Sequence, residues 1–202
     1  MVRIAVLVSG GGTNLQALID TEKKGGLGFG KISLCVSSKE GAYALTRAKE
    51  AGIPSNVISK PQYKNTEEYT KALISLLKEN DIDLVILAGF MVILPDAVIA
   101  AYRDRIINVH PSLIPSFCGE GFYGLKVHEA ALDYGVKVTG ATVHYVSEVV
   151  DGGKIIMQKA VDIQEGDTPE TLQKRVMEQA EWVILPKAVS KVCEAIEREK
   201  SI

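Results

Sequence analysis

Short apolar runs alternate with amphipathic segments along the first half of the chain. Runs made mostly of Val, Ile, Leu and Ala are typical of strands buried on both faces of a parallel sheet. The predicted strands are residues 2–8, 32–37, 55–59, 84–89 and 105–109. The segments between them have helical spacing, and the predicted helices cover residues 15–19, 42–51, 66–80 and 95–102. This alternation predicts an α/β fold with a Rossmann-like, mostly parallel sheet and helices on both faces.

The pattern changes after Gly124. A predicted helix at 126–134 is followed by two alternating segments, 140–146 and 154–161, which we expect to pair as antiparallel strands. The sequence from Asp167 to Glu170 is typical of a helix start, and helices are predicted from there to Glu199. With no break in composition, residues 1–202 are expected to form a single domain with an antiparallel C-terminal part.

The start of the helix at 66–80 is predicted from its capping residue. Thr66 is predicted to cap the helix at 66–80, because Glu67 and Glu68 follow it in the first turn, where the helix dipole favours acids.

Composition excludes several classes of function. Of the chain's 202 residues, 47% are hydrophobic and 24% are charged, which is typical of a globular protein. The formal net charge is -2, and this charge is unsuited to binding the phosphate backbone of a nucleic acid. The longest apolar runs are too short to span a membrane. Three scattered cysteines and no signal peptide predict a reduced, cytoplasmic protein. No His or Cys pair has metal-ligand spacing, so no metal is expected.

A glycine-rich loop, residues 9–14, follows the first strand and precedes the first helix. Open α/β sheets bind ligands at this edge, and backbone amides at a helix start can hold an anion. Leu15 occupies the third glycine position of the dinucleotide fingerprint, and the Lys-Ser/Thr ending of a triphosphate loop is absent. The loop therefore indicates a phosphomonoester site, although a tight structural turn would also use these glycines.

Asn108 and His110 end a predicted strand and point to the same face, because side chains alternate along strands. About forty residues later, Asp151 lies on a glycine turn with Gly152 and Gly153. An amide donor, an imidazole and a carboxylate can handle a carbonyl that becomes tetrahedral. Taken singly, each of these residues more often has a structural role, but together with the glycine loop they indicate acyl-type transfer.

The remaining candidates for catalysis are weaker. His144 is expected to support the site from an alternating strand, together with Thr142, and His128 is expected to face the substrate entrance from its helix. Ser112 is too close to His110 for a triad, and Cys118 has no evident base partner. Direct attack by a substrate amine on a bound acyl group is therefore favoured.

Four segments resemble the phosphoribosylglycinamide formyltransferases (glycinamide ribonucleotide transformylases), a family of 10-formyltetrahydrofolate-dependent enzymes of purine biosynthesis. They are Ser9-Gly10-Gly11-Gly12-Thr13-Asn14-Leu15-Gln16, Leu87-Ala88-Gly89-Phe90-Met91, Asn108-Val109-His110-Pro111-Ser112-Leu113-Ile114-Pro115 and Val150-Asp151-Gly152-Gly153. The resemblance extends to at least Pro186 and implies the formyltransferase fold, with 10-formyltetrahydrofolate and glycinamide ribonucleotide as substrates.

The resemblance also implies roles for individual residues. Asn108 donates to the formyl oxygen, His110 stabilises the same charge, and Asp151 relays the proton from the amine through a water. Glu181 contacts the substrate ribose, although the local match carries a one-residue shift. The substrate phosphate is expected to meet Gly11, Gly12, Thr13 and Asn14. The folate is expected to lie along Met91, Val92, Ile93 and Leu94 and against Val146, Ser147, Glu148, Val149 and Val150.

Two departures from the family stand out. Relatives often carry Arg at the positions of Val92 and Thr66, and Lys60 or Lys64 is expected to replace part of that charge. The glycine-rich segment at 118–124 is longer than in many relatives and is expected to be either a mobile lid or a plain variable loop.

Other functions remain open. The nearest are formyltetrahydrofolate deformylase, methionyl-tRNA formyltransferase and a sugar-amine formyltransferase. The tRNA enzyme carries an added C-terminal domain and a basic surface, and the deformylase carries an N-terminal regulatory domain. A chain of this length is not expected to hold either added domain. A non-catalytic nucleotide-binding module has no need for Asn108, His110 and Asp151 together. A monomer and a homodimer are equally compatible with the sequence.

Overall fold

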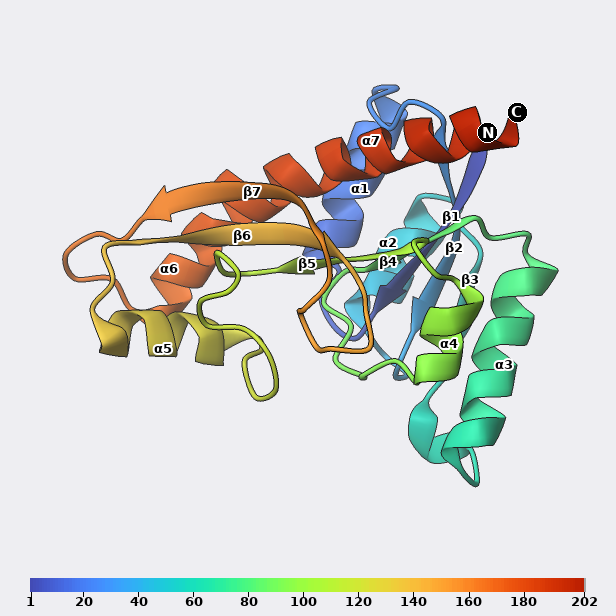
Figure 1. Ribbon diagram of the computed structural model, residues 1–202, viewed down its shortest axis with the longest axis horizontal. Helices are drawn as coiled ribbons and strands as arrows, with labels where there is room; N and C mark the ends of the chain where they lie inside the picture. Colours follow the sequence, from blue (N-terminus) through green and yellow to red (C-terminus); the bar gives the residue numbers. More distant parts are fainter. Residues whose placement is uncertain (202) are drawn as a thin grey trace.

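The computed structural model describes residues 1–201, which form a seven-stranded sheet in the order β3-β2-β1-β4-β5-β6-β7 (Figure 1). The first five strands are mutually parallel, and β6 and β7 are antiparallel additions at one edge. The strands are β1 (Val2–Val8), β2 (Gly30–Ser37), β3 (Ser55–Val57), β4 (Leu84–Leu87), β5 (Ile106–His110), β6 (Val138–Tyr145) and β7 (Ile155–Asp162). The predicted fold class is therefore confirmed, including the antiparallel C-terminal part.

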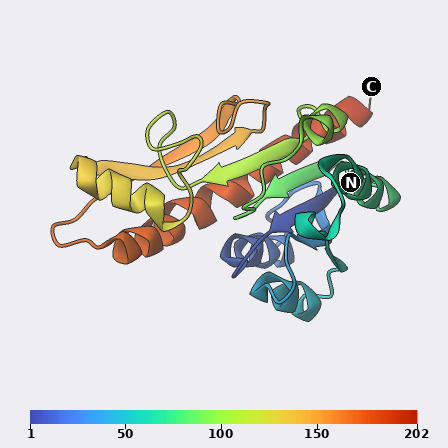
Figure 2. The same cartoon turned by 90° about the horizontal axis from the view of Figure 1, so that it is seen from below.

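Helices cover both faces of this sheet because the central strands are apolar on both sides. In β1, Ile4 and Val6 pack on one face while Ala5 and Leu7 pack on the other, as the period of two along a strand requires. The first face is covered by α1 (Thr13–Lys23), α2 (Tyr43–Glu50) and α7 (Trp182–Lys200). The opposite face is covered by α3 (Thr66–Glu79) and α4 (Asp96–Ala101). Figure 2 shows α7 running along the length of the sheet.

The C-terminal part extends the molecule beyond the parallel strands. There α5 (Leu125–Tyr134) packs against α6 (Pro169–Val176), which continues through a single π-helical turn (Met177–Glu181) directly into α7. The connection between β6 and β7 folds back towards the end of β5 and carries Asp151 (Figure 1). No helix among residues 1–201 has the length and apolar character needed to cross a membrane.

Three local features differ from the sequence-based expectations. The prediction that Thr66 caps α3 is wrong, since Asn65 has the extended backbone of a cap and its side-chain oxygen accepts from the Glu68 N–H at 2.8 Å. Thr66 is already the first helical residue. A short 3-10 helix at Lys60–Gln62 and the π-helical turn at Met177–Glu181 were not predicted.

Candidate active site

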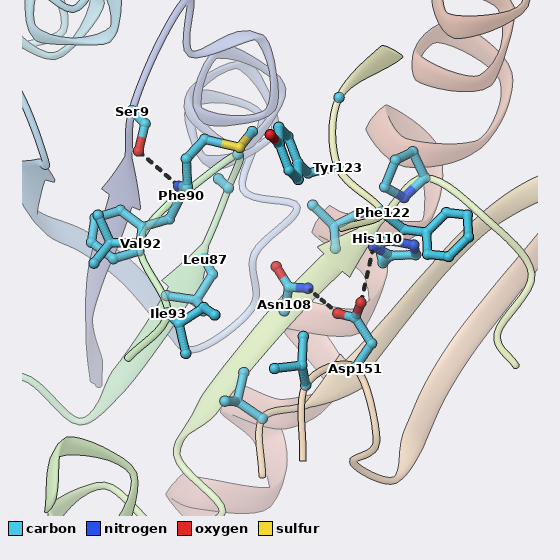
Figure 3. A pocket seen from close by; sticks show the side chains of 18 of the residues that line it. Ser9, Leu87, Phe90, Val92, Ile93, Asn108, His110, Phe122, Tyr123 and Asp151 are labelled. Carbon is cyan, nitrogen blue, oxygen red and sulfur yellow. Dashed lines mark hydrogen bonds and ion pairs between the residues drawn. The ribbon is translucent and has the colours of Figure 1, made fainter. Parts of the chain in front are cut away.

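A cavity of about 1070 Å³ lies at the carboxyl ends of β1, β4 and β5, where open α/β sheets bind ligands (Figure 3). Segments far apart in the sequence form its wall. They are the glycine loop (residues 9–14), the segment after β4 (residues 88–94), the end of β5 (residues 108–111), most of the loop before α5 (residues 118–124) and most of the β6–β7 loop (residues 146–151). Each predicted segment therefore contributes residues to one cavity, and of the predicted site residues only Val149 and Thr142 do not line it.

The glycine loop is shaped to expose backbone amides. Gly12 has a φ of +70°, and a Cβ at this position would lie 2.6 Å from the Cβ of Ala44 in α2, so only glycine fits. Helix α1 begins immediately afterwards at Thr13, where the first N–H groups of a helix have no partner within the helix. The Nε of Arg47 donates to the Gly11 carbonyl at 2.8 Å, which holds the loop against α2.

Ser9 fixes the glycine loop to the segment that follows β4. Its hydroxyl lies 2.6 Å from the Ser38 hydroxyl and accepts from the backbone N–H of Met91 at 2.8 Å. The side chain is buried, and Figure 3 shows it across the cavity from Asn108 and His110. Sequence analysis assigned no role to Ser9, Ser38 or Arg47, because their partners lie 29 to 82 residues away.

Asn108 is oriented by His144 of the neighbouring strand β6. The Nδ1 of His144 lies 2.8 Å from the Tyr145 carbonyl, which can only accept, so Nδ1 carries a proton. In the neutral ring Nε2 then accepts from the Asn108 amide nitrogen at 3.1 Å. The same nitrogen also donates to Asp151 Oδ1 at 3.5 Å. The amide nitrogen of Asn108 therefore lies between His144 and the Asp151 carboxylate.

His110 and Asp151 form the second half of this cluster. The Nε2 of His110 donates to the Phe117 carbonyl at 2.9 Å, which leaves Nδ1 facing Asp151 Oδ2 at 3.5 Å (Figure 3). Burial lowers the pKa of His110, although the Phe117 carbonyl and the Asp151 charge partly oppose this. The ring is thus neutral at pH 7 and can take a proton at Nδ1, next to a carboxylate.

Asp151 is kept ionised at a buried position. Burial acts to raise its pKa, but three groups together hold the pKa below its usual value: His144, whose Nε2 lies 3.6 Å from Oδ1 and donates there when the ring is protonated, the nearby His110, and the Gly119 backbone N–H, 2.9 Å from Oδ2. The residue has a φ of +55°, an uncommon conformation for a side chain other than glycine, and such strain gathers at functional sites. Gly153 follows with its Cα turned towards the Tyr145 carbonyl, where any Cβ would collide at 1.7 Å.

Glu181 lies on the cavity wall at the end of the π-helical turn. Its carboxylate accepts from the Asn14 amide nitrogen at 2.6 Å, and burial raises its pKa despite this hydrogen bond. A π-helical turn holds one more residue than an α-helical turn, and such turns are frequent at functional sites. The π turn directs Glu181 at Asn14 of the glycine loop.

The residues expected to contact folate lie on two segments of the cavity wall, the segment after β4, which Ser9 ties to the glycine loop, and the β6–β7 loop. Val92, Ile93 and Asn108 face one another across this part of the cavity (Figure 3). Val149 is the exception, since its side chain is 68% exposed and lies outside the cavity lining. The predicted folate residues that line the cavity are Met91, Val92, Ile93, Leu94, Val146, Ser147, Glu148 and Val150.

Thr142 is buried behind the cavity. Its hydroxyl donates to the Ser112 carbonyl at 2.6 Å and accepts from the Ile114 N–H at 3.1 Å. It therefore holds the backbone that follows His110.

The charge of the lining differs from expectation. Neither Lys60 nor Lys64 belongs to the lining, and its only lysines among residues 1–201 are Lys39 and Lys126. Five carboxylic acids line the same cavity, so acidic side chains outnumber basic side chains in the lining. They are Asp96, Glu120, Glu148, Asp151 and Glu181. No group of three His, Cys, Asp or Glu side chains within residues 1–201 is arranged to hold a metal ion.

Comparisons with known proteins agree with this geometry. Residues 2–189 match the formyl transferase family. The trifunctional purine biosynthetic protein adenosine-3 of Gallus gallus is 46% identical over 191 residues, which is 95% of this chain and 18% of that protein. The chain thus spans about a fifth of the length of the animal relatives that it matches.

A plant relative and a bacterial structure are closer in length. The chloroplastic phosphoribosylglycinamide formyltransferase of Arabidopsis thaliana is 36% identical, over 95% of this chain and 65% of that protein. The crystal structure of glycinamide ribonucleotide transformylase 1 from Symbiobacterium toebii has a TM-score of 0.90 at 40% identity, covering 96% of this chain and 89% of that one.

Proposed function

The chain belongs to the formyl transferase family, and we propose that it transfers the formyl group of 10-formyltetrahydrofolate to the amine of 5-phosphoribosylglycinamide. The products are N-formylglycinamide ribonucleotide and tetrahydrofolate. This is the reaction named for the Arabidopsis thaliana relative and for the Symbiobacterium toebii structure. We expect the reaction to take place in the cytoplasm.

One observation supports this proposal above all others. Asn108, His110 and Asp151 converge within 3.5 Å contacts at one end of a cavity whose other end is a loop of exposed backbone amides. A cluster for carbonyl chemistry and a phosphate anchor in the same cavity fit an acceptor that carries both a phosphate and an amine. Backbone amides at a helix start suit the phosphate without requiring an arginine.

The chemistry follows from the hydrogen bonds of the cluster. The acceptor amine attacks the formyl carbon, and a tetrahedral intermediate with a negatively charged oxygen forms. This oxygen takes the Asn108 amide donor, replacing the long 3.5 Å contact to Asp151. Donors that are already oriented stabilise such an oxyanion without a reorganisation cost. His110 adds to this stabilisation when Nδ1 is protonated beside Asp151.

The proton must move from the attacking amine to the departing folate nitrogen as the carbon–nitrogen bond of the donor breaks. Asp151 is ionised and faces Asn108 and His110, so we assign it the relay of this proton through a water. The tetrahydrofolate then leaves with the proton on its nitrogen. No group is left on the protein, which fits the Ser112 hydroxyl donating to the Ser116 carbonyl and not to a base.

The test is a direct assay with wild-type protein. We mix it with 10-formyltetrahydrofolate, add glycinamide ribonucleotide, and follow the deformylated folate by absorbance while product is identified by mass spectrometry. Turnover that depends on the amine supports the proposal. Turnover with water alone would assign the chain to the deformylase activity, and turnover only with a different amine to another formyl transfer.

A further inference from the structure

His128 is a buried histidine without an assigned partner. It lies in the first half of α5 with none of its side chain exposed, and it lines the cavity together with the loop before α5. Neither ring nitrogen hydrogen-bonds to a protein group anywhere in residues 1–201. Because buried polar atoms nearly always have a partner, an unpaired ring on a cavity wall points to a group that enters the cavity.

The other two histidines behave differently. His110 and His144 each donate to a backbone carbonyl, that of Phe117 and that of Tyr145, which fixes their rings. A histidine kept only for packing would be expected to have such an anchor. Since His128 has none, both nitrogens are unpaired, and because they are covered in this structure a ligand reaches them only when the cavity wall shifts.

The surroundings of His128 define the ligand. Helix α5 packs against α6, so His128 shares this end of the cavity with Gln173 and Met177, and the Oδ1 of Asn14 on the same wall is also buried without a partner. Burial, with a smaller effect from nearby His110, lowers the pKa of His128 to about 4. A neutral imidazole offers one donor and one acceptor, which suits a hydroxyl or an amide and not an anion.

We propose that His128 is a specificity-determining residue that hydrogen-bonds a neutral donor–acceptor group of the acceptor substrate, either a ribose hydroxyl or the glycinamide amide. This group lies between the phosphate at the glycine loop and the amine at Asn108. The proposal rests on the function proposed above. In addition to the residues that bind the phosphate and the amine of the acceptor, His128 then binds the part of the acceptor between them.

The experiment compares two substitutions of His128 with one control. His128→Leu fills a similar volume without hydrogen bonds, and His128→Gln keeps a donor and an acceptor near the position of Nε2. We expect His128→Leu to raise the acceptor KM about 10-fold, as the loss of one hydrogen bond implies, with little change in kcat or in the KM for 10-formyltetrahydrofolate. His128→Gln should stay within about threefold of wild type, and the exposed neighbour Glu129→Leu should not change the acceptor KM.

Thermal unfolding separates binding from folding. His128→Leu removes two buried unpaired nitrogens, so its Tm without ligand should not fall, while the rise in Tm that the acceptor alone gives wild type should shrink. A lower Tm with kcat and both KM values impaired together would overturn the proposal in favour of a packing role, and an unchanged acceptor KM in an active protein would also overturn it. If wild type itself neither turns over nor gains stability from the acceptor, the proposed function fails instead.

Acceptor analogues identify the contacted group. One analogue lacks a ribose hydroxyl and another has a methylated amide nitrogen. The analogue that is altered at the group contacted by His128 should bind wild type and His128→Leu equally. The other analogue should retain the difference of about 10-fold between the two proteins. If every analogue retains the full difference, His128 contacts neither group and the proposal is wrong.

Discussion

At the scale of single residues, the donor of Asn108 is aimed before any substrate arrives. His144 can accept from the amide only because its other nitrogen donates to the Tyr145 carbonyl, so the backbone of β6 sets the orientation of a side chain on β5. Hydrogen-bond donors fixed in this way typically stabilise a transition state more than flexible donors do. The sequence marked Asn108 and His144 as candidates, but it could not reveal that one orients the other.

Asn108→Ala is therefore expected to lower kcat about 100- to 1000-fold, since a single oxyanion donor is lost. The KM values should change little, because the donor acts mainly on the charge that develops during reaction. Initial rates followed by folate absorbance give both parameters. Asn65→Ala, an asparagine outside the cavity, is the matched control and should retain wild-type kcat. Near-normal turnover by Asn108→Ala would remove Asn108 from the mechanism.

His128 also makes the stability of the protein depend on pH. Its pKa is about 4 in the folded protein and about 6.5 in the unfolded chain, so only the unfolded chain binds this proton between those values. The folded state is then destabilised as pH falls below 6.5, by about 3 kcal/mol near pH 4. Burial lowers the pKa of His110 and acts in the same direction.

Urea unfolding at pH 7, 5.5 and 4.5 tests this effect in wild type and His128→Leu. The free energy of unfolding of the variant should fall less steeply with acid, because one of the two histidines whose pKa is lowered by burial is gone. Parallel pH curves for the two proteins would show that His128 is not held neutral in the folded state.

At the scale of helices and strands, the sequence predicted the elements well and their ends less well. The whole of β1 could be predicted, since an apolar run flanked by a glycine loop leaves little choice. The helix α3 begins at Thr66 as predicted, but its cap was assigned one residue too late, because Asn65 and Thr66 are both good capping residues and only the extended backbone at Asn65 decides between them. The π-helical turn had no local signal, since its one visible consequence is the contact of Glu181 with Asn14, 167 residues away.

The corrected cap leads to a stability test. Asn65→Ala should destabilise the protein by about 1 kcal/mol, because the Glu68 N–H loses its acceptor. Thr66→Ala should have a much smaller effect, as no hydrogen bond of its hydroxyl caps the helix. Urea unfolding at neutral pH measures both changes. Equal losses from the two substitutions would mean that the cap is shared between these residues.

At the scale of the whole molecule, the order of the strands assembles the site. Asn108 and His110 lie on the last parallel strand, which also pairs with the first antiparallel strand, β6. The loop after β6 returns to the same edge and brings Asp151 to them, although 41 residues separate Asp151 from His110 in the sequence. The sequence indicated which residues belong to the site, while their meeting depends on pairing between strands that no local pattern encodes.

The acidic lining of the cavity has a consequence for how fast the substrates arrive. Both proposed substrates are anions, and five acids against Lys39 and Lys126 create a field that does not draw anions in, even when Arg103 beside Glu148 is counted. We therefore expect kcat/KM for the acceptor to rise about two- to threefold as salt is increased from roughly 0.02 to 0.2 M, since salt screens the repulsion.

Steady-state rates over a potassium chloride series give this dependence directly. A steep fall of kcat/KM with salt would instead reveal long-range attraction by basic groups outside the lining. If kcat/KM rises with salt, the field of the protein does not speed the diffusional encounter with the acceptor. The phosphate is then bound only once it comes within hydrogen-bonding distance of the amides at the start of α1. Selectivity among phosphorylated metabolites then depends on the lifetime of the bound complex and not on the frequency of collisions.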